Sequence, residues 1–163
     1  MTTQETIERI KKDVHLPIAI QKYEETLVRN ETNCYSHAIG ATTPVLQIFR
    51  IGAISGEKSI SEKYKSASEI IDLLKKDLDV LGLEYQIIGD DENETQNLEP
   101  NQYIVRLYFK IYADGMIWDY HFMRYEAGKW TEKWKGRKPT EIDANYYEKR
   151  WEWKRGISLK VTR

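Results

Sequence analysis

Cysteine is nearly absent from this chain of 163 residues, in which Cys34 is the single example. A lone cysteine forms no intrachain disulfide, which is typical of proteins from a reducing compartment. Residues 1–13 are polar and lack the apolar core of a secretory signal. The sequence also has no apolar run of the ~18 residues needed to span a bilayer. We therefore expect a cytoplasmic protein with no membrane partner.

An excess of charge of either sign is also missing, because 25 basic residues face 26 acidic ones and the net charge is −1. Nucleic-acid-binding domains usually show a basic excess or a basic face, so the composition gives no sign of a nucleic-acid partner. The local basic cluster near the C-terminal end is interleaved with acidic residues, which favours a solvated face over phosphate binding. This cluster comprises Lys129, Lys133, Lys135, Arg137 and Lys138.

The common motifs for metals and nucleotides are missing as well. No CxxC, HxxxH or HExxH spacing occurs, and Cys34-x-x-His37 is at most half of a zinc site. Neither GxGxxG nor GxxxxGK[ST] is present, so no loop is predicted to cradle a phosphate. We expect no metal and no cofactor.

The hydrophobic pattern changes its period halfway along the chain. Apolar residues at helical spacing predict helices over residues 2–14 and 61–81. Runs of β-forming residues predict strands over residues 83–88, 102–112, 116–125, 129–134 and 157–161. Residues 146–153 fit a helix or a strand. Helices first and an antiparallel sheet second predict an α+β fold, and the length suits one domain over residues 1–163.

Cys34 follows a polar loop and opens a predicted short helix, which Asn33 or Thr32 can cap and Gly40 can end. The unpaired N–H groups and the dipole at a helix N-terminus lower the pKa of a thiol and activate it as a nucleophile. Free cysteines are also often buried for structural reasons. A nucleophile and a structural cysteine are therefore both open interpretations.

His121 lies on the predicted strand 116–125, where Asp119, His121 and Met123 share one face. A thiol base needs a rigidly held imidazole, and a strand provides this. His37 is the alternative base. It lies on the same predicted helix as Cys34, which leaves little room for a substrate carbonyl beside the sulfur, so His121 is favoured.

Two carboxylates accompany His121 in the sequence. Glu132, on the next strand, can accept a hydrogen bond from the imidazole and fix its tautomer, or it is an exposed hairpin carboxylate. Asp119 lies ~6–7 Å away along the same strand and suits substrate contact better. The five Trp residues, all in the last third of the chain, fit sheet packing, or they wall a groove for a peptide or a glycan.

Three segments resemble a bacterial and phage group of the papain-like cysteine peptidase superfamily. Residues 33–39 (NCYSHAI) are similar to its NCYxxAl segment, residues 119–124 (DYHFMR) to DYHwyR, and residues 130–136 (WTEKWKG) to W-x-H-K-x-G. The segments occur in the expected order. The resemblance implies a papain-like fold, with N-terminal helices packed on a C-terminal antiparallel sheet, and Cys34 and His121 as catalytic residues in a cleft between helix and sheet.

The chain departs from this group at Glu132, where the group tends to have histidine. A carboxylate can orient an imidazole as well, so Glu132 remains the candidate third member. For the oxyanion we expect the backbone N–H of Cys34, with Asn30 or Asn33 as the side-chain donor.

These features predict a cysteine hydrolase, a peptidase or amidase, that cleaves an amide bond through a thioester on Cys34 with His121 as base. The expected partner is a peptide, protein or peptidoglycan substrate. Two alternatives stay open. One is a thiol-dependent transferase or effector that acts on a specific host protein, and the other is a non-catalytic binding module on the same scaffold.

Overall fold

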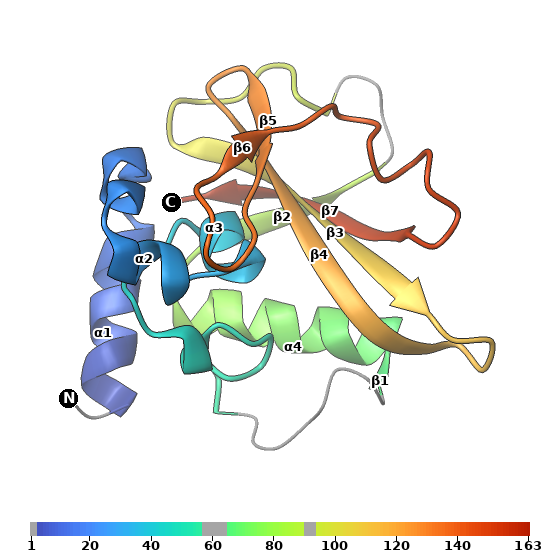
Figure 1. Cartoon of the computed structure of the whole chain (residues 1–163), viewed down its shortest axis with the longest axis horizontal. Coiled ribbons are helices and arrows are strands. Elements are labelled where there is room, and N and C mark those ends of the chain that lie inside the picture. Colours follow the sequence, from blue (N-terminus) through green and yellow to red (C-terminus); the bar gives the residue numbers. More distant parts are fainter. Residues whose placement is uncertain (1–2, 57–64, 90–93) are drawn as a thin grey trace.

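The computed structural model describes residues 3–56, 65–89 and 94–163, and its helices precede almost all of its strands (Figure 1). The helical elements are α1 (Thr3–Val14), η1 (Ile20–Glu24), α2 (Thr26–Asn30), α3 (Cys34–Ile39), η2 (Leu46–Ile48) and α4 (Ala67–Val80). The strands are β1 (Lys65–Ser66), β2 (Glu84–Ile88), β3 (Gln102–Ile111), β4 (Met116–Glu126), β5 (Lys129–Glu132), β6 (Thr140–Glu141) and β7 (Lys154–Thr162). The expected α+β arrangement is confirmed.

The strands form one sheet in the order β2-β7-β3-β4-β5-β6, and β1 pairs with the start of β4. Every pairing among the described strands is antiparallel. The long hairpin of β3 and β4 forms the middle of the sheet, with α4 and α1 on one side of it (Figure 1). None of the described helices is long and apolar enough to cross a membrane.

The central strand β3 is buried on both faces along most of its length, and its side chains alternate between the two faces. On β3, Leu107 and Phe109 belong to the main core, beneath the helices. Ile104 and Tyr108 point to the other face and join a second apolar cluster with Met123 of β4. The two faces of β4 therefore meet different surroundings, which matters for the side chains of the site.

Residues 146–153, expected as a helix or a strand, form neither and instead run as a series of turns. Only a few side chains of this segment, among them Tyr147 and Trp153, pack on the second cluster. Its apolar residues therefore show no regular spacing. Tyr108 donates a hydrogen bond to Glu148 (2.9 Å) and fixes the segment further. It is held onto the sheet by these contacts rather than by backbone pairing.

Three predicted boundaries differ by two residues or more, among them the start of the last strand, which is expected at residue 157 and lies at Lys154. The helix expected from residue 61 begins at Ala67, after a Ser66 cap whose hydroxyl accepts from the N–H of Glu69; residues 57–64 lie outside the described residues. The strand expected over 129–134 ends at Glu132. Beyond this end, the Lys133 ammonium group donates hydrogen bonds to the backbone carbonyls of Arg29 and Thr32.

Asp77 of α4 anchors the loop that flanks α3. Its buried carboxylate accepts hydrogen bonds from the Tyr35 hydroxyl (2.6 Å) and from the N–H groups of Gly52 (2.8 Å) and Ser55 (2.8 Å). Burial raises the pKa of Asp77, and these donors offset part of that rise. One carboxylate thus connects α4, α3 and the loop after η2.

Replacing Asp77 with alanine is expected to lower the free energy of unfolding by about 2–4 kcal/mol, because two buried donors and a half-buried one lose their acceptor. Chemical denaturation measures this loss. Asp72 lies exposed on the same helix, so Asp72→Ala is the matched control and should change stability by less than about 0.5 kcal/mol. Equal losses in the two variants would refute the anchoring role.

Candidate active site

Cys34 is the first residue of α3, and a capping box fixes the start of this short helix. The side chain of Asn33 accepts hydrogen bonds from the N–H groups of Tyr35 (3.0 Å) and Ser36 (3.1 Å), while the N–H of Asn33 donates to the Ser36 hydroxyl (2.7 Å). The N–H of Cys34 is at the first helical position, where no intrahelical acceptor exists. The half-buried thiol therefore sits beside an available backbone donor.

The other end of α3 is clamped to β4 by Arg124. Its guanidinium group donates to the carbonyls of Ala38 (3.0 Å) and His37 (3.4 Å) and pairs with Glu126. Gly40 ends the helix at a φ of +82°, and a Cβ there would lie 3.2 Å from Arg124 Nη1. Glycine is needed at this position both for the left-handed backbone and for the close approach of the guanidinium.

His121 lies on the part of β4 that is left between two partner strands. β1 pairs with Met116 and Ile117, and β5 pairs with residues 124–126, so among the described strands none covers this edge of β4 around His121. α3 packs against β4 (Figure 1), and Cys34, its first residue, interacts with His121. The His121 side chain is fully buried, and its Nε2 donates to Glu132 Oε2 at 2.9 Å.

The surroundings of His121 favour its protonated form. Burial alone would lower the pKa of His121, but interactions with Cys34 and Glu132 raise it to about 9. Nδ1 is buried and forms no hydrogen bond with any described residue. Because Nε2 is bonded to Glu132, Nδ1 is the ring nitrogen available to the Cys34 sulfur. These two atoms do not form a hydrogen bond in this structure. Thiol and serine sites without substrate often show such loose contacts.

Glu132 is a partner of the imidazole and not an exposed hairpin carboxylate, since its side chain is only 14% exposed. Burial would raise the pKa of Glu132, but hydrogen bonds from His121 and Tyr147 lower it overall. The Tyr147 hydroxyl donates to Glu132 Oε2 at 2.5 Å. The carboxylate thus remains ionised, and His121 and Tyr147 both donate hydrogen bonds to its Oε2.

Aromatic rings enclose the imidazole. The Trp134 ring stacks on His121 with centroids 4.0 Å apart and an angle of 9° between the planes. The rings of Tyr147 and Trp153 lie 5.2 Å and 6.3 Å from it. This packing keeps the imidazole in one orientation and limits the access of water to the His121–Glu132 contact.

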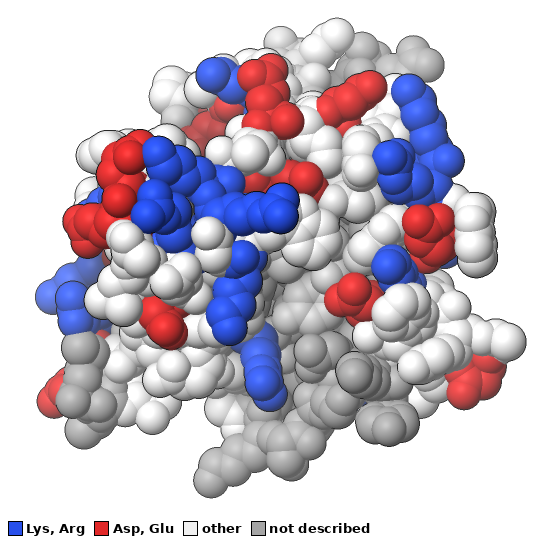
Figure 2. Space-filling model, viewed as in Figure 1, with Lys and Arg blue, Asp and Glu red and all other residues white. Residues whose placement is uncertain are grey.

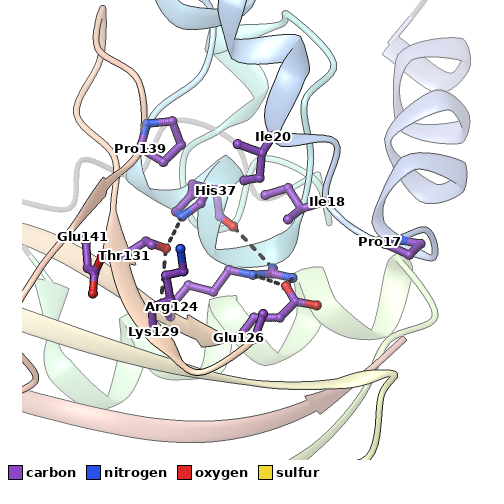
Figure 3. Close-up of a pocket in the computed structure, with 11 residues that line it drawn as sticks. Pro17, Ile18, Ile20, His37, Arg124, Glu126, Lys129, Thr131, Pro139 and Glu141 are labelled. Atoms are coloured by element: carbon purple, nitrogen blue, oxygen red, sulfur yellow. Dashed lines mark hydrogen bonds and ion pairs between the residues drawn. The ribbon is translucent and has the colours of Figure 1, made fainter.

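His37, the alternative base, serves a structural role on the helical side of the sheet. Its Nε2 pairs with the Thr131 hydroxyl (2.8 Å), and Figure 3 shows its ring pointing toward Thr131. Its Nδ1 faces the Tyr23 hydroxyl (3.4 Å). Burial, followed by the positive charges of Arg124 and Lys133, holds the pKa of His37 well below its usual value. The imidazole therefore stays neutral, and both of its nitrogens are occupied.

A pocket of about 580 Å³ opens next to His37, between the segment before η1 and the strands β5 and β6 (Figure 3). Its walls include Pro17, Ile18, Ile20 and Pro139. Cys34, His121 and Glu132 do not line it. The pocket thus reaches α3 at His37, and the His121 imidazole does not face it.

The three residues expected to contact the oxyanion or substrate have other surroundings. Besides capping α3, Asn33 donates from Nδ2 to the carbonyl of Phe49 (2.7 Å), so its amide is engaged in structure. Asn30 is exposed at the end of α2, next to the turn at Gly136. Asp119 is half-buried and accepts from the N–H of Tyr120 (2.8 Å). The structure groups His121 and Glu132 with Cys34, whose N–H is the backbone donor available next to the thiol.

Lys133 corrects the expectation of a uniformly solvated basic cluster, because its side chain is completely buried. The alternation of side chains along the strand could have indicated this burial. Thr131 faces the helices, and Lys133, two residues later, points to the same side. Tyr147 carried no such signal, since its segment has no regular structure. On the face in Figure 2, acidic and basic side chains both occur, and several Lys and Arg side chains gather left of its centre.

No group of three or more His, Cys, Asp or Glu side chains within residues 3–56, 65–89 and 94–163 is arranged to hold a metal ion. The described residues instead bring together one thiol, one imidazole and one carboxylate, those of Cys34, His121 and Glu132. Comparisons of the chain with protein-family models, with curated proteins and with solved structures find no match in any of the three. The geometry of the Cys34–His121–Glu132 group is therefore the basis for any assignment of function.

Proposed function

We propose that the chain is a papain-like cysteine hydrolase, a peptidase or amidase, with Cys34 as nucleophile and His121 as base. The observation that carries the proposal is the buried His121 imidazole, which interacts with the Cys34 thiol and bonds to the Glu132 carboxylate. A base held between a nucleophile and an orienting carboxylate is the arrangement that activates thiols and hydroxyls for acyl transfer.

In the first half of the reaction, His121 takes the proton of the Cys34 thiol. The imidazolium persists at neutral pH because the pKa of His121 is raised to about 9. The thiolate attacks the carbonyl carbon of the amide, and the Cys34 N–H donates to the oxyanion that forms. His121 then gives its proton to the leaving amine as the C–N bond breaks, which leaves a thioester on Cys34.

In the second half, neutral His121 takes a proton from a water molecule that attacks the thioester. The C–S bond breaks, the carboxylic acid leaves, and the proton returns to the Cys34 sulfur. Glu132 stabilises the imidazolium in both halves and fixes its orientation, with Tyr147 holding the carboxylate in place. Trp134 covers one face of the imidazole and keeps water from competing for the ion pair.

A groove of about 430 Å³ lies by the start of α3, although Cys34, His121 and Glu132 are not among its lining residues. It is lined by Asn33 and Tyr120, the chain neighbours of Cys34 and His121, and by residues of the η2 segment such as Phe49 and Arg50. Apolar and polar groups are mixed in this lining, which suits the side chains of a peptide-like substrate. We propose an amide in a peptide, a protein or peptidoglycan as the bond that is cleaved.

The first prediction concerns the alkylation of Cys34. Iodoacetamide should modify the wild type at about pH 6 at least ~10 times faster than His121→Ala, because the imidazolium stabilises the reactive thiolate. Rates measured against pH by mass spectrometry check this. His15→Ala, which removes a histidine bonded to the Leu81 carbonyl, is the control and should behave as the wild type. Equal profiles in wild type and His121→Ala, with one inflection near ~8.5, would contradict the proposal and favour a binding module.

The second prediction concerns Glu132. Glu132→Gln keeps the size of the side chain but removes its charge, so the pKa of His121 should fall and alkylation at about pH 6 should slow by ~10–100-fold. Tyr147→Phe, which removes one donor to the carboxylate, should slow it only a few-fold. NMR titration of the His121 ring in the three proteins measures the change directly. An unchanged titration in Glu132→Gln would exclude the carboxylate from the site.

The third prediction concerns hydrolysis itself. Incubation with a peptide library and with peptidoglycan fragments should yield new amine termini with the wild type, and Cys34→Ala should yield none. Asp119→Ala removes the substrate contact expected from the sequence and should raise KM more than it lowers kcat. Product formation by Cys34→Ala at the wild-type rate would rule out the thiol mechanism.

A further inference from the structure

Lys133 combines complete burial with a full set of hydrogen bonds. Its Nζ donates to the carbonyls of Arg29 (2.9 Å), Thr32 (3.0 Å) and Trp134 (3.1 Å). An ammonium group has three protons, so each proton has one acceptor. The site is therefore built for the charged form of the side chain, although none of the three acceptors carries a charge.

Lys133 has no carboxylate partner within the part of the chain that the structure describes. Buried cations are usually paired, because an isolated charge in the interior is costly. The titratable groups that face it are Cys34, His37 and Tyr23, whose ring lies 5.7 Å from Nζ. The pKa of His37 is lowered and that of Tyr23 is raised, so both stay neutral near pH 7. Cys34 is the one member of this set that can supply a negative charge.

We propose that Lys133 is a positioning residue of the thiol site: its ammonium group ties the loop leading into Cys34 to the chain that follows Glu132, and it places a second positive charge beside the sulfur. Thr32 lies two residues before Cys34, and Trp134 lies two residues after Glu132. One group thereby connects the nucleophile's helix to the segment that holds the base. The inference deepens the proposed function and rests on it.

The charge on Lys133 is linked to the charge on Cys34. Burial lowers the pKa of Lys133 to about 8, and Cys34 acts in the opposite direction. The ammonium group is present through neutral pH and is lost as the pH rises through about 8. Linkage is reciprocal, so if Lys133 stabilises the thiolate, the thiolate must stabilise the ammonium group by the same free energy.

The first test compares the iodoacetamide rate of Cys34 at about pH 6.5 in Lys133→Met, Lys133→Arg and Lys135→Met. Lys135 is exposed in the same loop, so Lys135→Met removes an equal charge from the surface and is the matched control. Lys133→Met should react ~10-fold or more slowly than the wild type, Lys135→Met at the wild-type rate, and Lys133→Arg between the two because it keeps the charge. A wild-type rate in Lys133→Met would overturn the proposal.

The second test leaves Lys133 intact and therefore holds even if Lys133→Met does not fold. The titration of the Lys133 side chain is followed by NMR, through its Nζ and Cε signals, in the wild type and in Cys34→Ala. The midpoint should be at least about half a pH unit lower in Cys34→Ala, because the stabilising anion is gone. The same midpoint in both proteins would overturn the proposal.

The failures of the two proposals are distinguishable. If His121→Ala slows alkylation and Lys133→Met does not, the hydrolase proposal stands and the role of Lys133 is wrong. If neither substitution changes the rate, both fail. A loss of rate in both variants, with an unchanged Lys135→Met, supports both.

Discussion

The docking of α3 against β4 is the constraint on which the whole site depends. A helix of six residues has too little hydrogen bonding of its own to persist in water, so its position must come from its contacts. Asn33 fixes its first turn and bonds to the Phe49 carbonyl, and Arg124 holds its last carbonyls. Because Cys34 is the first residue of this helix, these contacts also set where the sulfur lies relative to His121.

The balance of charge around the thiol follows from the same docking. Two cationic groups, the His121 imidazolium and the Lys133 ammonium, are buried near Cys34, and Glu132 is the carboxylate that contacts the imidazolium. One more negative charge is needed to balance them in a medium of low polarity. A thiolate, or the oxyanion of a tetrahedral intermediate, meets this need. The resting and reacting states of the proposed mechanism are thus the states that the surrounding charges favour.

Much of the fold and the central part of the site can be predicted from local sequence signals. The Asn33 cap and the Gly40 stop mark α3, and the alternation around His121 marks β4, because both patterns depend on near neighbours in the chain. The same alternation on β5 places Glu132 on the face of His121. These are features for which local propensity and the final structure agree.

The remaining parts of the site depend on contacts that only the folded chain creates. Lys133 stands among exposed lysines, and its burial follows from carbonyls supplied by Arg29 and Thr32, far away in sequence. Tyr147 belongs to a segment without any period, and its hydroxyl meets Glu132 only because the turns lie over the sheet. The sequence leaves Asn30 and Asn33 both open as oxyanion donors, because the bond from the Asn33 amide to the distant Phe49 carbonyl is not visible in the local pattern.

The stacking of Trp134 on His121 gives the molecule an optical property. An indole is a fluorophore, and a protonated imidazole in contact with its face withdraws electron density from the excited state and quenches its emission. With ring centroids 4.0 Å apart, the emission of Trp134 is coupled to the proton on His121. In the proposed mechanism, each transfer of that proton, to a thiolate, to a leaving amine or from water, therefore changes the light that this one indole emits. The partly exposed Trp134 ring also responds to any molecule that binds against its outer face.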